Sequence, residues 1–253
     1  MAFSSLFVVT NPLRLRRFAP SLMNPHRHLR SEGATAKPGW FCPGLGCHLL
    51  TPAYDAVTGL LGFGRRYMTA VAARIDIDPE ERLLDLGCGT GILLAAIAAR
   101  QPSAVLAGID PDPRMLALAR RRLSPAVALH VGFAQELPFL DASIDVAVST
   151  LVFHHLTDPV KAAALAEVRR VLTPAGRLHL VDFGAPTGRL SATLLRLGSV
   201  FDGRASTRVN LAGQLPRVLA EAGFAVQEIA PAYRGVRHLR CTPVDRPDSG
   251  VTP

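Results

Sequence analysis

Short apolar runs alternate with longer segments of mixed polarity between residues 82 and 181. The short runs are typical of strands that are buried on both faces, whereas the longer segments carry apolar residues at helical spacing. This alternation predicts a parallel sheet with helices on both faces. Strands are predicted at Arg82–Leu86, Val105–Ile109, Ala128–Val131, Ile144–Ser149 and Arg177–Val181, and helices at Gly91–Arg100, Pro113–Leu123 and Pro159–Val171.

The segments on either side of this alternation extend the domain. Residues 52–61 and 64–75 have a helical pattern. Later, residues 211–224 predict a helix that stops at Gly223, because glycine readily adopts the left-handed conformation that ends helices. Residues 225–231 and 235–241 then have the pattern of two adjacent strands, which predicts a hairpin. We therefore expect one α/β domain over residues 46–241, with its N-terminal helices in residues 46–76.

The two ends of the chain have a different composition. Residues 1–45 are rich in Pro, Arg, Ser and Gly without a sustained period, and we expect a basic, disordered leader there. Its composition resembles a transit peptide, and an alternative is that Met23 is the true start. Residues 242–253 are expected to be a disordered tail.

Charge and hydropathy narrow the possible partners. The net charge is +8, but residues 1–40 hold six basic residues and one acidic residue, so the domain itself is only mildly basic. We therefore expect no nucleic-acid partner. No run of 18 apolar residues occurs, which argues against a transmembrane helix. A cytoplasmic protein is expected.

The four cysteines do not indicate a disulfide framework or a metal site. They are too few for a chain of this size, so reduced thiols are the simpler interpretation. The stretch "CPGLGCH", residues 42–48, lacks a second pair of ligands at metal-binding spacing. No metal is expected.

Three glycines fall within five positions in the turn "GCGTG" that follows the strand Arg82–Leu86. Gly87 allows a tight turn, Gly89 lets a ligand approach the backbone, and Gly91 lets the helix pack closely against the strand. Dinucleotide-binding enzymes use G-x-G-x-x-G at this place, but here the spacing is G-x-G-x-G. Asp85 also lies two residues before the first glycine. These two features favour a ligand that has an ammonium group and no phosphate.

A second acidic residue follows the next strand. Asp110 lies 19 residues after Gly91, at a position where a carboxylate can accept both hydroxyls of a ribose. Asp112 is expected to cap the following helix, with Pro113 in its first turn. Since Asp112 fills the capping role, Asp110 is left for a ligand.

Four stretches together resemble a known family. They are "LLDLGCGTG", "GIDPDPRMLALA", "LPFLDASIDVAVSTLVFHHL" and "EVRRVLTPAGRLHLVDFG". They are similar to class I S-adenosylmethionine-dependent methyltransferases, and most similar to the small-molecule group that includes the ubiquinone/menaquinone C-methyltransferases. The resemblance covers about Tyr54 to Cys241. It implies a Rossmann-like, doubly wound seven-stranded sheet, mostly parallel with the last strand antiparallel, and S-adenosylmethionine as cofactor.

The resemblance also implies roles for particular residues. Asp85 would hold the ammonium group of the cofactor and Asp110 its ribose. Phe133 stands where the family usually has an acid, so weaker contact with the adenine is expected, although Ala134 can still offer its backbone N–H. The remaining residues that would border the cofactor are Gly87, Cys88, Gly89, Gly91, Pro111, Met115, Ser149 and Thr150.

Methyl transfer requires alignment and exclusion of water more than acid–base chemistry. His154 is a candidate polar contact or base; the alternative is that one histidine of "FHHL" caps the helix near Asp158 and the other packs at its edge. Tyr54 is a candidate to cover the cofactor through a cation–π contact. Its alternative is an ordinary aromatic residue on an amphipathic helix.

Residues 184–210 are expected to form a lid over the acceptor, and their Leu, Val and Phe content favours an apolar acceptor. The sequence therefore predicts a methyltransferase that acts on a small hydrophobic molecule by in-line transfer. One alternative is a lipid or quinone methyltransferase with weak contact to a membrane surface. Another is a non-catalytic member of the fold that binds the cofactor or serves as a scaffold. The oligomeric state stays open.

Overall fold

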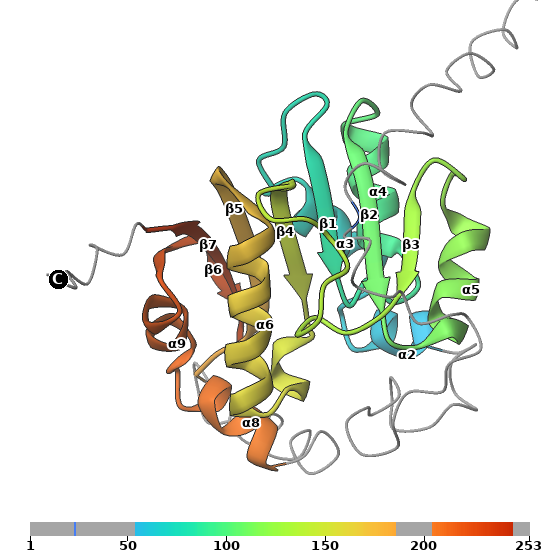
Figure 1. Ribbon diagram of the computed structural model, residues 1–253. Helices are drawn as coiled ribbons and strands as arrows, with labels where there is room; N and C mark the ends of the chain where they lie inside the picture. The colour runs from blue at the N-terminus through green and yellow to red at the C-terminus, as the bar shows by residue number, and fades with distance from the viewer. Residues whose placement is uncertain (1–22, 24–53, 186–203, 245–253) are drawn as a thin grey trace, which may run out of the picture.

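The described part of the chain forms a seven-stranded sheet between two layers of helices (Figure 1). The structure is a computed structural model that describes residue 23 and residues 54–185 and 204–244. The strand order is β3-β2-β1-β4-β5-β7-β6. The strands are β1 (Arg82–Leu86), β2 (Val105–Asp110), β3 (Ala128–Val131), β4 (Ile144–Thr150), β5 (Leu172–Phe183), β6 (Phe224–Tyr233) and β7 (Val236–Pro243).

The pairing of the strands confirms the expected topology. Strands β1 to β5 pair in parallel, and β7 pairs antiparallel with both β5 and β6. The hairpin predicted from residues 225–241 is the β6–β7 pair. The carboxyl ends of β1, β2 and β4 therefore meet at one edge of the sheet, where ligands bind in folds of this class.

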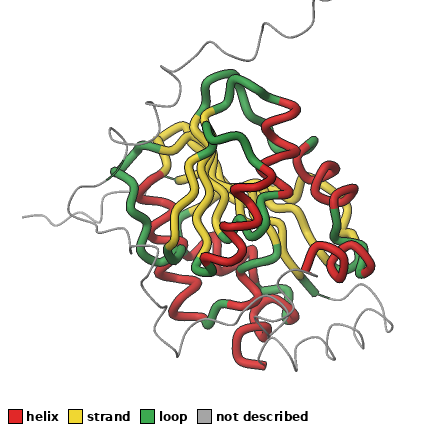
Figure 2. Tube along the Cα trace, turned by 90° about the vertical axis from the view of Figure 1, so that its right-hand side faces the viewer, coloured by secondary structure: helices red, strands yellow, loops and turns green. Residues whose placement is uncertain are grey.

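Helices cover both faces of the sheet, as Figure 2 shows from the side. One buried cluster contains Leu165 and Leu219, and the other contains Val71, Leu94 and Leu116. These aliphatic side chains explain why a chain with few aromatic residues still has a continuous core. The helices are α2 (Tyr54–Leu60), α3 (Arg65–Ala72), α4 (Ile92–Arg100), α5 (Pro113–Arg122), α6 (Asp158–Val171), α8 (Arg204–Leu211), α9 (Leu215–Glu221) and the 3-10 helix η3 (Phe153–His155). Among the described helices, none has both the length and the apolar character that a bilayer span requires.

Two predicted elements were wrong in extent. The helix predicted over 211–224 is interrupted, because Gly213 has a φ of 69° and Pro216 begins a new helix, α9. Gly223 follows α9 with a φ of 86°, in agreement with its expected role as a stop. Strand β5 begins at Leu172 and not at Arg177.

Several expectations fall on residues outside the described ranges. The leader predicted over 1–45 lies outside them, except for Met23, which forms an isolated β-bridge with Phe139. Most of the lid predicted over 184–210 and most of the tail predicted over 242–253 also lie outside. The domain limits therefore stay predictions.

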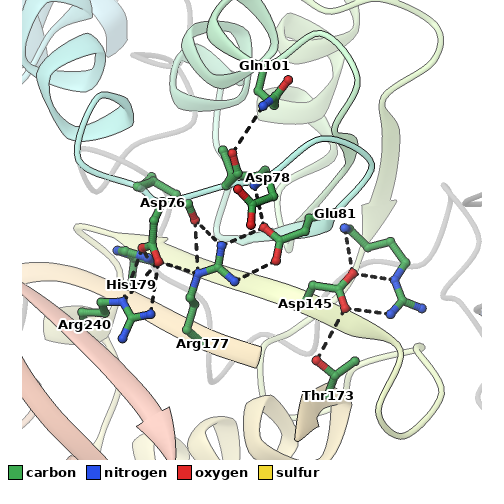
Figure 3. Close-up of polar contacts among 12 residues, drawn as sticks. Asp76, Asp78, Glu81, Gln101, Asp145, Thr173, Arg177, His179 and Arg240 are labelled. Atoms are coloured by element: carbon green, nitrogen blue, oxygen red, sulfur yellow. Dashed lines mark hydrogen bonds and ion pairs between the residues drawn. The ribbon is translucent and has the colours of Figure 1, made fainter. Parts of the chain in front are cut away.

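A network of arginines and acids joins the amino ends of the strands to the segment that leads into β1 (Figure 3). Arg177, on β5, binds the carboxylate of Glu81 at 2.7 and 2.8 Å, and its Nε lies 2.9 Å from Asp76 Oδ2. Arg82 binds Asp145 through Nε and Nη2 at 2.7 and 2.8 Å. The hydrogen bonds from Arg177 hold the pKa of Glu81 below its usual value. Asp76, Glu81 and Asp145 thus each have a cationic partner.

Candidate active site

The glycine turn connects β1 to α4 at the carboxyl edge of the sheet. Gly87, Gly89 and Gly91 all have left-handed backbones, with φ values of 72°, 53° and 75°. A Cβ on Gly87 would lie 2.4 Å from a methyl carbon of Val152, whereas a Cβ on Gly89 would meet no atom within 4 Å. Packing therefore requires Gly87, while the backbone at Gly89 faces open space that a ligand can enter.

Gly91 has a different neighbour from the one expected. A Cβ there would lie 2.8 Å from Leu123 Cδ1 and 3.1 Å from the Cβ of Ala119, on α5. The predicted close packing of helix and strand was thus wrong in its partner. Gly91 instead allows the start of α4 to approach the end of α5.

A cavity of about 60 Å³ lies in front of this turn. The helix α2 covers this edge, where the arrowheads of β1, β2 and β4 lie in Figure 1. Six of the predicted site residues line the cavity. The six are Tyr54, Asp85, Gly87, Cys88, Gly89 and Thr150. The sequence did not single out the other lining residues, which are Thr58, Phe63, Met68, Thr90, Ile92, Leu93 and Leu151.

Two polar side chains at this cavity have no partner among the described residues. The carboxyl group of Asp85 is 2% exposed and receives no hydrogen bond from them. Burial, together with the negative charge of Asp110, raises its pKa to about 8. The hydroxyl of Thr150 is buried and likewise unpartnered. Since buried polar groups are normally hydrogen-bonded, these two indicate a site built for a ligand.

Cys88 is an inert neighbour of these groups. Burial, with the charges of Asp110 and Asp85, raises the pKa of its thiol. A Cβ on Gly108 would lie 2.6 Å from its sulfur, so the thiol occupies the space that this glycine leaves. Cys88 therefore contributes packing and not a nucleophile.

Asp110 holds the turn in place. Its Oδ2 accepts a hydrogen bond from the backbone N–H of Gly89 at 2.9 Å, and its Oδ1 accepts one from Asp112 N–H at 2.8 Å. Burial nevertheless raises its pKa to about 6. Asp112 caps α5 as predicted, by accepting from Arg114 N–H at 2.8 Å. Asp110 thus has a structural role that the sequence did not predict, and each of its oxygens keeps further acceptor capacity.

Helix α2 is fastened to the glycine turn by the residue next to Tyr54. Asp55 accepts a hydrogen bond from Thr90 Oγ1 at 2.7 Å and another from Arg122 Nη2 at 2.6 Å. Arg122 also donates to the backbone oxygen of Thr90. This contact places Tyr54 at the cavity. The sequence analysis assigned a role to Tyr54 and none to Asp55, although the two residues are adjacent.

His154 follows β4 in η3 and is 5% exposed. Its Nδ1 lies 2.7 Å from Asp182 Oδ1, and its backbone N–H donates to Asp182 Oδ2 at 3.2 Å. Burial opposes ionisation of Asp182, but the charge and hydrogen bond of His154 hold its pKa below the usual range. The alternative that a histidine caps α6 was wrong, because Thr157 is the capping position.

The comparison with protein families agrees with this geometry. Residues 83–176 match the family model described as a methyltransferase domain. This range contains the glycine turn, both buried acids of the site and His154. This part of the chain is therefore similar to methyltransferase domains.

The full-length relatives of this chain include named methyltransferases. It is 34% identical over 153 residues to a demethylmenaquinone methyltransferase of Deinococcus radiodurans, with 58% of this chain and 63% of that protein covered. The chain spans between 50% and 63% of the length of the first relatives that it matches.

Solved structures share the fold of this chain. The YcgJ protein of Bacillus subtilis has a TM-score of 0.53 and 25% identity, over 65% of this chain and 71% of that one. A phosphoethanolamine N-methyltransferase of Haemonchus contortus, in complex with S-adenosylhomocysteine, has a TM-score of 0.59 and 20% identity, over 73% of this chain and 45% of that one. The second likeness shows the fold alone.

The remaining predicted residues do not line the cavity. Ser149 is fully buried, and its hydroxyl donates to the backbone oxygen of Leu86 at 3.3 Å, so only its backbone is left for a ligand. Met115 is buried in α5. The loop of Phe133 and Ala134 lies next to Asp110, because the N–H of Gly132 donates to the backbone oxygen of Asp110 at 3.2 Å. Gly91, Asp110, Pro111, Met115, Phe133, Ala134, Ser149 and His154 are absent from the described cavity wall.

Proposed function

We propose that this protein transfers a methyl group from S-adenosylmethionine to a small, apolar acceptor. The observation that carries the proposal is the Asp85 carboxyl group, which is buried beside the open backbone of Gly89 without a partner among the described residues. Leaving a buried acid unpaired is unfavourable unless a ligand completes it. The family match supports the choice of cofactor.

The residues of this edge fit the polar groups of the cofactor. Asp85 would take the ammonium group, and Thr150 offers a hydroxyl with no other described partner. Asp110 would accept the ribose hydroxyls with its remaining acceptor capacity. Phe133 and Ala134 would adjoin the adenine, in the loop held next to Asp110. When bound, the cofactor supplies a methyl group already activated by its sulfonium.

The side chains around the cavity then have to position the acceptor and exclude water. Tyr54, Phe63, Met68 and Leu151 supply an apolar and aromatic surface for this purpose. The ring of Tyr54 can also face a cation favourably. The hydrogen bond that Asp55 accepts from Thr90 would hold this surface against the glycine turn.

His154 is our candidate for the proton acceptor, with Asp182 as the residue that positions it. The Asp182 carboxylate, 2.7 Å from Nδ1, favours the tautomer with the proton on Nδ1. Nε2 is then the basic atom, which can take a proton from an oxygen or carbon acid. Asp182→Asn should therefore lower kcat more than it changes the KM for the cofactor.

The names of the relatives favour a second candidate for the acceptor. The Deinococcus radiodurans relative is a demethylmenaquinone methyltransferase, so a quinone met at a membrane surface is an acceptor to test. The apolar surface at the cavity is compatible with it.

The proposal is tested by calorimetric titration of S-adenosylhomocysteine into the wild type and Gly89→Ala. The added methyl group meets no protein atom, so it occupies space that the ligand needs. We expect the wild type to bind and the variant to bind at least about 10-fold more weakly, which is about 1.4 kcal/mol. Asp110→Asn should weaken binding as well.

Gly59→Ala is the matched control, because a Cβ there also meets no atom within 4 Å but lies on α2, away from the turn. It should bind as the wild type does. Equal affinity of Gly89→Ala and the wild type would contradict the site. A wild type that binds nothing at high micromolar ligand would favour the scaffold alternative.

A further inference from the structure

A second and larger cavity, of about 540 Å³, lies between α3 and the strands β5, β6 and β7. This volume is within the range of small-molecule sites, about 300–1,000 Å³. Among the described residues, no side chain lines both cavities. Helix α3 separates them, since Met68 borders the cavity at the glycine turn and Tyr67 borders the larger one.

One wall of the larger cavity is aromatic. The rings of Tyr67 and Tyr233 are stacked with centroids 5.2 Å apart and an interplanar angle of 27°. Phe63 packs edge-on against both, at 5.3 and 6.2 Å. Burial raises the pKa of Tyr67, so its hydroxyl stays neutral. Such a wall favours a flat aromatic ligand.

The charged side chains that line this cavity are all cationic. Arg65, Arg66, Arg74 and Arg237 line it, and no described acidic residue does. Arg237 contacts Glu228 at 3.6 Å through Nη1, but its Nε is buried and has no hydrogen-bond partner among the described residues. A guanidinium with an unused, buried donor is suited to a carboxylate or another planar anion.

A chain of three side chains ends at the same cavity. Asp76 Oδ1 lies 2.7 Å from Nε2 of His179, and Nδ1 of His179 lies 3.1 Å from Nε2 of His238. Figure 3 shows the first of these contacts. The carboxylate favours a proton on Nε2 of His179, which leaves Nδ1 as an acceptor for the N–H of His238. Nδ1 of His238 is then a bare acceptor.

This acceptor has no described partner within the protein. His238 is 5% exposed, lines the cavity, and its Nδ1 is buried without a hydrogen bond from the described residues. Burial, followed by the charges of His179 and Arg74, lowers its pKa to about 3, so the ring is neutral at physiological pH. A buried, neutral imidazole nitrogen of this kind favours a hydroxyl or amine donor.

We propose that this cavity binds a small, flat aromatic molecule that carries an acidic group and a hydroxyl or amine donor. The arginines bind the acidic group, the tyrosine rings pack against the aromatic part, and Nδ1 of His238 accepts from the donor. The proposal does not depend on methyl transfer, because the two cavities have separate walls.

Fluorescence titration with 6-hydroxy-2-naphthoate tests it, since this probe has all three features. Two analogues each lack one of them: 2-naphthoate has no hydroxyl and 2-naphthol has no acid. We expect the wild type to bind 6-hydroxy-2-naphthoate at least about 10-fold more tightly than either analogue. Equal binding of the three probes, or no binding of the first at millimolar concentration, would overturn the proposal.

Two variants test which side chains contact the acid group and the hydroxyl group of the probe. The double variant Arg65→Ala/Arg66→Ala changes two exposed side chains and should weaken binding of both acids at least about 10-fold, with 2-naphthol unaffected. His238→Phe should abolish the preference for the hydroxylated acid over 2-naphthoate. Should His238→Phe fail to fold, the three-probe comparison on the wild type decides.

Arg217→Ala is the matched control, because Arg217 is an exposed arginine on α9 that does not line the cavity. It should leave all three affinities unchanged. Unchanged binding of both acids by the double variant would contradict the cationic contact. S-adenosylhomocysteine binding, measured on the same samples, should be retained throughout, so that failure here is distinguishable from failure of the proposed methyl transfer.

Discussion

Two acidic residues at the amino ends of the strands differ from two at the carboxyl ends in their partners and in their pKa values. At the amino ends of the strands, Glu81 and Asp145 each bind an arginine, and their pKa values lie below the usual range. At the carboxyl ends, Asp85 and Asp110 are buried without a described cationic partner, and their pKa values rise to about 8 and about 6. Acidic residues thus stabilise the fold at the amino ends of the strands. At the carboxyl ends, we propose that they bind a ligand.

The largest loss of stability is expected when the ion pairs at the amino ends of the strands are removed. Arg177→Ala removes a guanidinium that is 9% exposed and leaves Glu81 and Asp76 without it. Losing one partner of a buried ion pair is strongly destabilising, and we expect the free energy of unfolding to fall by about 3 kcal/mol. This is the lower end of the range, because both acids reach solvent. Urea unfolding measures it.

Arg217→Ala is the control for this change. Arg217 and Glu221 form an exposed pair one helical turn apart, at 3.0 Å, with side chains 72% and 60% exposed. We expect a loss below about 0.5 kcal/mol. Equal losses in the two variants would mean that the network of Figure 3 does not stabilise the fold.

At the carboxyl ends of the strands, Asp85 should make the stability of the protein depend on pH. The pKa of Asp85 is raised from 3.8 to about 8, so over this interval the folded state keeps a proton that the unfolded chain releases. The contribution of Asp85 to stability therefore falls as pH rises through this window. Asp85→Asn should remove the loss and make the variant more stable than the wild type at pH 8.

This difference should shrink at pH 5, where the wild-type carboxyl is protonated in the folded state. Urea unfolding of both proteins at the two pH values measures it. An equal pH dependence of the unfolding free energy in the two proteins would show that ionisation of Asp85 does not destabilise the fold. The two ends of the sheet would then not differ in how easily their acidic residues ionise.

The smallest change in stability is expected from the contacts of Asp55, which join α2 to Thr90 in the glycine turn and to Arg122. Asp55→Asn weakens the bonds from Thr90 and Arg122, whose partner carboxylate is 33% exposed. We expect a loss of about 1 kcal/mol in stability. Because Tyr54 is placed by this contact, the affinity for S-adenosylhomocysteine should also fall a few-fold. A calorimetric titration that finds stability lowered but affinity unchanged would separate the contacts of Asp55 from the site.

Local pattern predicted much of the fold. The limits of β1 and β3 match the predicted ranges, because each short run of mostly apolar residues ends directly before a glycine. The start of β5 was missed, since Thr173 to Gly176 includes proline and glycine and has the composition of a turn. The predicted helix over 211–224 is interrupted, because Gly213 has a left-handed backbone and Pro216 begins a new helix, and helical periodicity shows neither effect.

The site was predictable only where its residues are close in sequence or match the family motifs. Tyr54, Asp85, Gly89 and Thr150 lie at the cavity as expected. The partners that fix the site come from distant segments: Asp55 contacts Arg122 across 67 residues, and His154 contacts Asp182 across 28. Periodicity carries no information on such pairs. The larger cavity depends in the same way on α3 meeting β6 and β7.

We expect Asp85 to stay neutral until the ammonium group of the cofactor binds beside it. At pH 7 a group with a pKa of about 8 is mostly protonated, and a bound ammonium favours its ionised form. Calorimetric titration of S-adenosylhomocysteine at pH 7, in phosphate and in Tris, measures the protons released from the buffer dependence of the heat. The account predicts release of about one proton by the wild type and much less by Asp85→Asn. Binding by the wild type without proton release would contradict it.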